Sequence, residues 1–98
     1  MTDKKFIVGN WKMNLSPQEA ASLVQGISNN FTAHAKCEMV LCPPFPYLLP
    51  SATALANTQI ALGAQDISNQ DKGAFTGDVA GGMLKDCGCK YVIIGHSE

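Results

Sequence analysis

The chain has 98 residues, 46% of them hydrophobic and 15% charged, which suits one globular domain or part of one. A formal net charge of −1 removes the electrostatic basis for binding nucleic acid or an anionic membrane, so neither is expected as a partner. The start is polar and no long apolar run follows it, so neither a signal peptide nor a membrane span is expected, and a cytoplasmic protein is predicted.

Strand and helix signals alternate in the first third of the chain. Residues 5–8 predict a short apolar strand that ends at Gly9. Ser16-Pro17-Gln18-Glu19 then combines an N-cap serine, a proline at the first helical position and a glutamate that completes a capping box. The predicted helix carries one apolar stripe, formed by Ala20, Leu23, Val24, Ile27 and Phe31.

Two more strands are predicted in the middle of the chain. The second covers residues 39–42 and is ended by Pro43-Pro44. A shorter, proline-interrupted helix lies within residues 47–56, and the third strand covers residues 60–64. The polar segment 65–77 follows, and it is long for a strand-to-helix connection.

The last helix and strand are predicted from Thr76 onward. Thr76 is the expected N-cap, with Asp78 placed favourably for the helix dipole. The helix would run to Asp86, with Gly81-Gly82 inside it destabilising it by about 1 kcal/mol per glycine. Its expected buried face consists of Val79, Met83 and Leu84. The fourth strand, residues 90–94, is β-branched and apolar, which is typical of a strand covered on both faces.

The resulting order is βαβαβαβ, an α/β fold in which right-handed crossovers make all four strands parallel. Residues 1–98 contain no linker and are interpreted as a single partial domain. The pattern fits either a small doubly wound sheet or the amino-terminal half of a (β/α)8 barrel, also called a TIM barrel.

Reactive side chains follow the first and the last predicted strand. Asn10 and Lys12 are two residues apart, so on extended backbone they share a face, with Trp11 on the other. His96-Ser97-Glu98 follows Gly95 after the fourth strand. In a flat sheet these two strands would stand about 14 Å apart. Lys12 and His96 could converge on one small substrate only in a curved sheet, which favours the half barrel.

The remaining candidate ligands are given structural interpretations. Cys37 and Cys42 bracket a predicted strand and would lie about 16 Å apart, too far for one zinc ion with ligands at about 2.3 Å. Cys87 and Cys89 flank Gly88 at a helix-to-strand junction. All four are expected to be reduced and packed, with no metal. His34 is expected on a solvated loop.

Four runs resemble the triosephosphate isomerase family. Gly9-Asn10-Trp11-Lys12-Met13-Asn14 is similar to its amino-terminal signature, and Val92-Ile93-Ile94-Gly95-His96-Ser97-Glu98 is similar to its fourth strand. Gly63-Ala64-Gln65-Asp66 and Lys72-Gly73-Ala74-Phe75-Thr76-Gly77 are similar to its third strand and the loop after it. The resemblance spans essentially the whole chain.

The resemblance implies an isomerase of glycolysis and gluconeogenesis that interconverts dihydroxyacetone phosphate and glyceraldehyde 3-phosphate through an enediolate, without metal or cofactor. Asn10 and Lys12 would bind the substrate, and Lys12 would supply positive charge to the phosphate and to the enediolate. His96 would be the neutral electrophile that moves protons between oxygens, a role carried over from the family. Ser97 and Glu98 would support these groups, with Glu98 pairing with Lys12.

The resemblance also implies a homodimer. The segment 65–77 would insert into a partner subunit, with Gln65 and Thr76 as dimer contacts. The family's general base is a glutamate after a later strand, and no residue here matches it. The 98 residues alone are therefore predicted to be inactive. Their open edges at the first and last strands predict self-association or poor folding.

Two other classes stay open on the residues themselves. One is a different phosphate-handling (β/α) barrel enzyme. The other is a small non-enzymatic α/β binding module with a flat sheet, in which Lys12 and His96 decorate the surface.

Overall fold

The computed structural model describes residues 5–31 and 36–98, so the prediction for His34 lies outside the described residues. The strands are β1 (Lys5–Asn10), β2 (Cys37–Cys42), β3 (Ala61–Ala64) and β4 (Tyr91–Val92). All pairings are parallel and the order is β1-β2-β3-β4. The predicted parallel α/β fold is confirmed.

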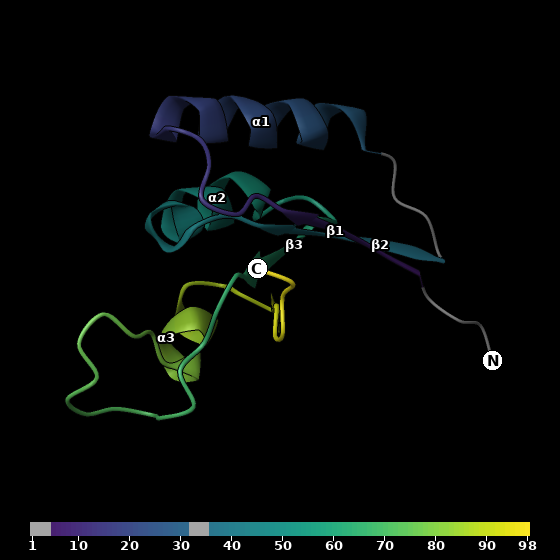
Figure 1. Cartoon of the computed structure of the whole chain (residues 1–98). Helices are drawn as coiled ribbons and strands as arrows, with labels where there is room; N and C mark the ends of the chain where they lie inside the picture. The colour runs from purple at the N-terminus through teal and green to yellow at the C-terminus, as the bar shows by residue number, and fades with distance from the viewer. Residues whose placement is uncertain (1–4, 32–35) are drawn as a thin grey trace.

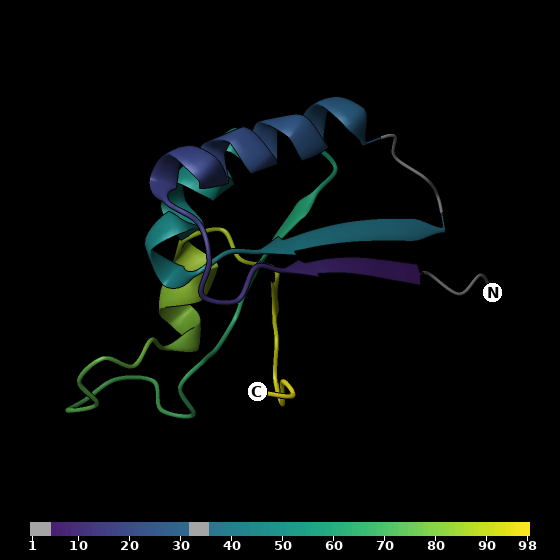
Figure 2. The ribbon, with the colours of Figure 1, turned by 45° about the horizontal axis from the view of Figure 1, so that its top comes forward.

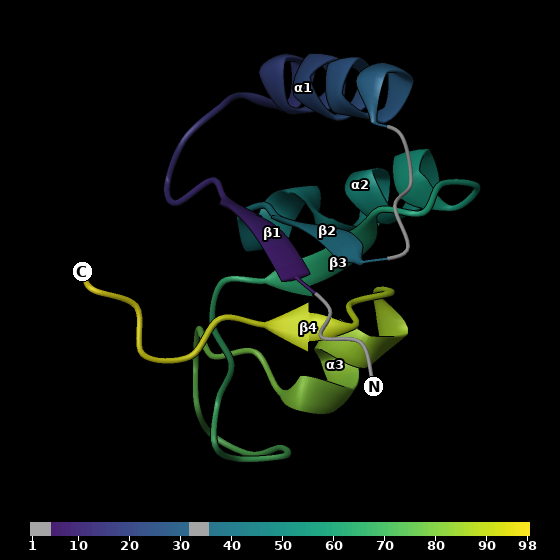
Figure 3. The ribbon, with the colours of Figure 1, turned by 90° about the vertical axis from the view of Figure 1, so that its right-hand side faces the viewer.

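The helices lie outside the arc that the strands form. They are α1 (Pro17–Asn30), the 3-10 helix η1 (Phe45–Tyr47), α2 (Leu48–Leu55) and α3 (Gly81–Asp86). In Figure 3 the four strands follow a curve, with α1, α2 and α3 on its outer side. Figures 1 and 2 show α1 and α2 next to each other, and Figure 3 shows α3 beside β4. This is the arrangement of a half barrel.

The capping box predicted for α1 is present. The Glu19 N–H donates to Ser16 Oγ (3.2 Å), and the Ser16 N–H donates to Glu19 Oε1 (2.9 Å). The backbone hydrogen bond from Ser16 lowers the pKa of Glu19, because it stabilises the carboxylate form. Two backbone N–H groups at the start of the helix, which have no partner within the helix, are thereby hydrogen-bonded.

The core lies between the sheet and the helices. Of the predicted stripe on α1, Ala20 and Val24 are buried, whereas Leu23 is exposed. Gly63 allows β2 and β3 to approach closely, because a Cβ there would lie 2.7 Å from Cys42 Sγ. The buried cluster consists of Trp11, Ala20, Val24, Leu41, Leu48, Leu55, Ile60, Leu62, Ala64 and Leu84.

The prediction for the start of α3 is wrong. The N-cap is Ala80, and Thr76 instead lies in a turn closed by the Asp78 N–H on the Phe75 carbonyl (2.9 Å). The Met83 N–H donates to the Ala80 carbonyl (3.1 Å), whereas an earlier helix start would require it to donate to the Val79 carbonyl, which accepts from the Ser68 N–H (2.8 Å). The two glycines are therefore the first helical residues, not interior ones.

Two burial predictions are also corrected. Met83 was expected on the buried face of α3 but is 56% exposed, while Leu84 is buried as predicted. β4 contains only two paired residues, and Ile94 beyond it is 77% exposed. Both residues of β4 are only partly buried, so the expectation that this strand is covered on both faces is wrong. In β1 the side chains of residues 6–8 are about half exposed.

Side-chain contacts across the sheet demonstrate its curvature. The rings of Phe6 in β1 and Tyr91 in β4 meet edge to face, with centroids 5.5 Å apart. Glu38 in β2 accepts a hydrogen bond from the Tyr91 hydroxyl (2.9 Å) and pairs with the Lys90 ammonium (3.2 Å). A flat sheet would separate β1 from β4 by about 14 Å. The expected curvature is confirmed.

We expect the Glu38→Gln substitution in the complete protein to make the Tm less dependent on pH in the alkaline range. Glu38 raises the pKa of Lys90 by hydrogen bonding and charge. Loss of solvent, followed by the hydrogen bond to Glu38, raises the pKa of Tyr91. Both groups hold their protons more tightly in the folded state. Their contribution is therefore complete below the unfolded-state pKa values and is lost as pH rises through the folded ones.

Thermal unfolding of the complete protein, followed from about pH 8 to about pH 11.5, tests this expectation. The wild-type Tm should fall more steeply at the alkaline end than that of Glu38→Gln, which should start lower at neutral pH. Asp71→Asn, an exposed loop substitution, is the matched control. Parallel profiles for wild type and Glu38→Gln would refute the assignment.

Candidate active site

The chain leaves β1 toward the same edge as the ends of the other parallel strands. Trp11 is buried, and its backbone N–H donates to the Cys42 carbonyl at the end of β2 (3.2 Å). Asn10 Oδ1 accepts from the Lys12 N–H (3.0 Å). Asn10 thus holds the backbone that carries the lysine, in addition to presenting its own side chain at this edge.

Lys12 does not continue the extended backbone that the sequence predicted. Its φ is 57°, in the left-handed region. For a residue with a Cβ this conformation costs roughly 1–2 kcal/mol, so it persists only where surrounding contacts impose it. The sharp turn still leaves Asn10 and Lys12 lining a common hollow, so the expected juxtaposition holds for a different geometric reason.

The segment after β4 brings three polar residues to the same place. Gly95 adopts φ 71° and redirects the chain, which then runs to the side where the chain leaves β1 (Figure 3). Glu98 Oε2 accepts from the Ser97 hydroxyl (2.6 Å) and lies 3.5 Å from Lys12 Nζ. The hydrogen bond from Ser97, followed by the Lys12 charge, lowers the pKa of Glu98. The predicted Lys12–Glu98 pair is present.

These groups line one open hollow of about 320 Å³ at the carboxyl ends of the strands. Asn10 and Lys12 come from the β1 side, and His96 and Glu98 come from the segment after β4. His96 is exposed and makes no hydrogen bond to any other described residue. The hollow therefore presents an ammonium, an amide, an imidazole and a carboxylate to a small polar molecule.

The sequence reasoning did not assign three residues to this hollow, and one of them, Gln65, was expected at the dimer contact instead. Met13 and Asp66 also line it, and Met13 is 95% exposed. Asp66 is the second residue after β3, so its position beyond the end of a parallel strand was a usable signal. Met13 gave none, because an exposed methionine in a turn has no distinctive pattern.

The two predicted dimer contacts lie in different settings. Gln65 is half buried, and its Nε2 donates to the carbonyls of Lys12 (2.9 Å) and Cys42 (2.8 Å) within the chain. Thr76 is exposed in the turn before α3. Thr76 therefore presents an exposed side chain to a partner subunit, whereas the Gln65 amide is engaged within its own chain.

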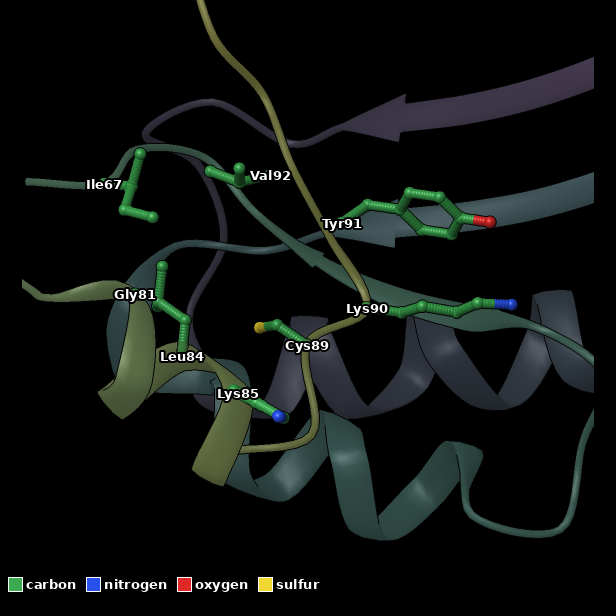
Figure 4. A pocket seen from close by; sticks show the side chains of 8 residues that line it. All are labelled: Ile67, Gly81, Leu84, Lys85, Cys89, Lys90, Tyr91 and Val92. Atoms are coloured by element: carbon green, nitrogen blue, oxygen red, sulfur yellow. The ribbon is translucent and has the colours of Figure 1, made fainter. Parts of the chain in front are cut away.

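A larger hollow of about 430 Å³ lies between α3 and β4 but lacks a reactive cluster. Figure 4 shows Cys89 and Leu84 on one side of it, with the Tyr91 and Lys90 side chains pointing away from them. The Lys90 ammonium and Tyr91 hydroxyl are both engaged by Glu38. Size alone would therefore select the wrong hollow.

The four cysteines are free thiols. Cys42 is buried, and this burial, with a smaller effect of Cys89, raises the pKa of its thiol to about 11. Within residues 5–31 and 36–98, no group of three His, Cys, Asp or Glu side chains is arranged to hold a metal ion. None of the helices in these residues combines the length and apolarity needed to cross a membrane.

Curled parallel strands, outer helices and a polar cluster at the strand ends place the chain in the class of (β/α) barrel proteins, as an amino-terminal half barrel. The family model described as "Triosephosphate isomerase" matches residues 5–98. The chain belongs to the triosephosphate isomerase family.

Curated relatives support the same assignment over nearly the whole chain. Triosephosphate isomerase of Carboxydothermus hydrogenoformans is 48% identical over 97% of this chain and 38% of its own length. The Thiobacillus denitrificans protein of the same name is 50% identical, with 97% and 37% covered. That of Rhodopirellula baltica is 46% identical, with 100% and 39% covered. The chain thus spans less than two fifths of the length of these relatives.

Proposed function

We propose that these residues form the amino-terminal part of an enzyme that interconverts dihydroxyacetone phosphate and glyceraldehyde 3-phosphate through an enediolate. The observation that carries the proposal is the shared hollow, where Lys12 from one end of the chain meets His96 and Glu98 from the other. The curled sheet also argues against a flat-sheet binding module.

Each group has a role that its chemistry allows. The Lys12 ammonium would attract the substrate phosphate and stabilise negative charge on the enediolate oxygens. Asn10 would orient the substrate through its amide. The His96 ring would donate a hydrogen bond to the carbonyl oxygen and then carry a proton between the two oxygens of the enediolate. Glu98, kept ionised by Ser97, would orient Lys12 between turnovers.

The carbon proton requires a further group. Removing a proton next to a carbonyl needs a base held within hydrogen-bond reach of it, and in this family that base is a glutamate after a later strand. Among residues 5–31 and 36–98, the carboxylates that line the hollow are Asp66 and Glu98. Asp66 accepts from the Ile67 N–H (2.9 Å), and Glu98 pairs with Lys12. We therefore propose that the base comes from chain beyond these residues.

The proposal extends to a cytoplasmic homodimer that serves glycolysis and gluconeogenesis, with the segment 65–77 at the subunit contact. Supporting this contact, residues 69–77 are exposed throughout, and Phe75 is 45% exposed. Met13 at the rim of the hollow is almost fully exposed as well. Apolar side chains presented this way favour burial against a second subunit.

An isomerase assay on two purified chains tests the proposal. The complete protein expressed from its gene should convert glyceraldehyde 3-phosphate, whereas residues 1–98 alone should show no turnover above buffer. Fragment activity comparable with that of the complete protein would overturn the role given to the missing base. Inactivity of the complete protein would overturn the proposed reaction. Sedimentation velocity should show a dimer of the complete protein.

A further inference from the structure

Lys12 is held mainly through its backbone. The ion pair with Glu98 joins side chains that are 56% and 50% exposed, and exposed pairs of this kind contribute little. The left-handed backbone of Lys12 therefore needs other support. Its N–H is bound by Asn10 Oδ1, and its carbonyl accepts from Gln65 Nε2 (2.9 Å).

The Gln65 amide joins three strand ends. It follows β3 directly, and its two amide hydrogens serve the carbonyl of Lys12 after β1 and the carbonyl of Cys42 at the end of β2. Because both partners are carbonyl oxygens, which can only accept, the amide nitrogen must face them. The Cys42 carbonyl also accepts from the backbone N–H of Trp11. The residue directly before Lys12 is therefore held at the same point.

We propose that Gln65 is a positioning residue that sets the place of the Lys12 ammonium in the hollow. This inference rests on the proposed function and adds to it a group that acts on Lys12 through the backbone carbonyl of that residue. Replacing the amide removes both donors at once, and the Lys12 turn then loses the contact on its carbonyl. Displacement of a charged group by about 1 Å is sufficient to reduce catalysis roughly 100-fold.

Gln65→Leu in the complete protein tests the proposal, since leucine has a similar size and no donor. We expect kcat/KM to fall roughly 10- to 100-fold and inorganic phosphate, measured by calorimetry, to bind several-fold more weakly. In a Lys12→Ala background the same substitution should change kcat/KM less than about twofold, because Gln65 acts through Lys12. Gln25→Leu is the control: Gln25 is exposed on α1, and its side-chain amide donates to Asn29 Oδ1 on the same helix.

Three results would overturn the proposal. One is an unchanged phosphate affinity and kcat/KM in a folded Gln65→Leu variant. Another is an equal, additive loss in the Lys12→Ala background. The third is a loss that recovers at higher protein concentration, which would assign Gln65 to the dimer contact instead. If the wild-type complete protein shows no turnover, the proposed function fails, and the phosphate affinities of wild type, Gln65→Leu and Lys12→Ala decide the positioning role.

Discussion

His96→Gln in the complete protein is expected to lower kcat by roughly 10²–10⁴-fold, the usual contribution of a positioned acid–base group. The glutamine amide can still donate a hydrogen bond to the substrate carbonyl, but it cannot pass a proton between two oxygens. Substrate binding should change much less than kcat, because the lost step belongs to the transition state. Steady-state kinetics in both directions of the reaction measures the separation.

The second histidine of the chain supplies the control for this experiment. His34 is predicted on a solvated loop, so His34→Gln should leave kcat and KM unchanged. A His96→Gln enzyme that retained wild-type kcat would remove the imidazole from the mechanism. A parallel loss in both variants would point to a general effect of histidine replacement and would contradict the assignment equally.

Lys12→Ala is expected to lower kcat/KM by at least about 100-fold, the scale of removing one electrostatic stabiliser from an active site. Because the ammonium would meet both the substrate phosphate and the enediolate, KM should rise and kcat should fall together. Inorganic phosphate should also lose most of its inhibitory effect. Inhibition constants measured at several salt concentrations check the electrostatic origin, since screening weakens a charge–charge contribution.

A second lysine tests whether the effect is specific. Lys85 is exposed in the last turn of α3, next to the larger hollow and away from the candidate site. Lys85→Ala removes the same charge from the protein and should leave kcat/KM within about twofold of wild type. An equal decrease in both variants would show that net charge, not the position of Lys12, controls the reaction.

Much of the fold followed from local patterns. The capping signals at Ser16 and Glu19 predicted the start of α1, because caps use side chains only three residues apart. The short apolar runs predicted the parallel strands, since each run must find cover on the sheet. The start of α3 was mispredicted: Thr76 has the residue type of a cap, but it lies in the turn that the Asp78 N–H closes on the Phe75 carbonyl, and the helix begins after Ala80.

The candidate site was predictable as a set of residue types and strand ends, but not as a geometry. Asn10, Lys12 and His96 follow predicted strands, where (β/α) proteins place their polar groups. The left-handed turn at Lys12 was not visible, because lysine carries no sequence signal for positive φ. The inward direction of Gln65 was equally hidden, since a polar residue at a loop start is normally assigned to the surface.

The sequence by itself determined the order of the elements, their parallel direction and the four runs that indicate the triosephosphate isomerase family. These depend on neighbouring residues, caps and periodicity, which are local properties of a chain. Only the tertiary structure decided that Phe6 meets Tyr91, that Glu38 binds Lys90 and Tyr91, and that Gln65 joins three strand ends. Each of these contacts depends on the curvature of the sheet, which arises from packing all four strands and their helices together.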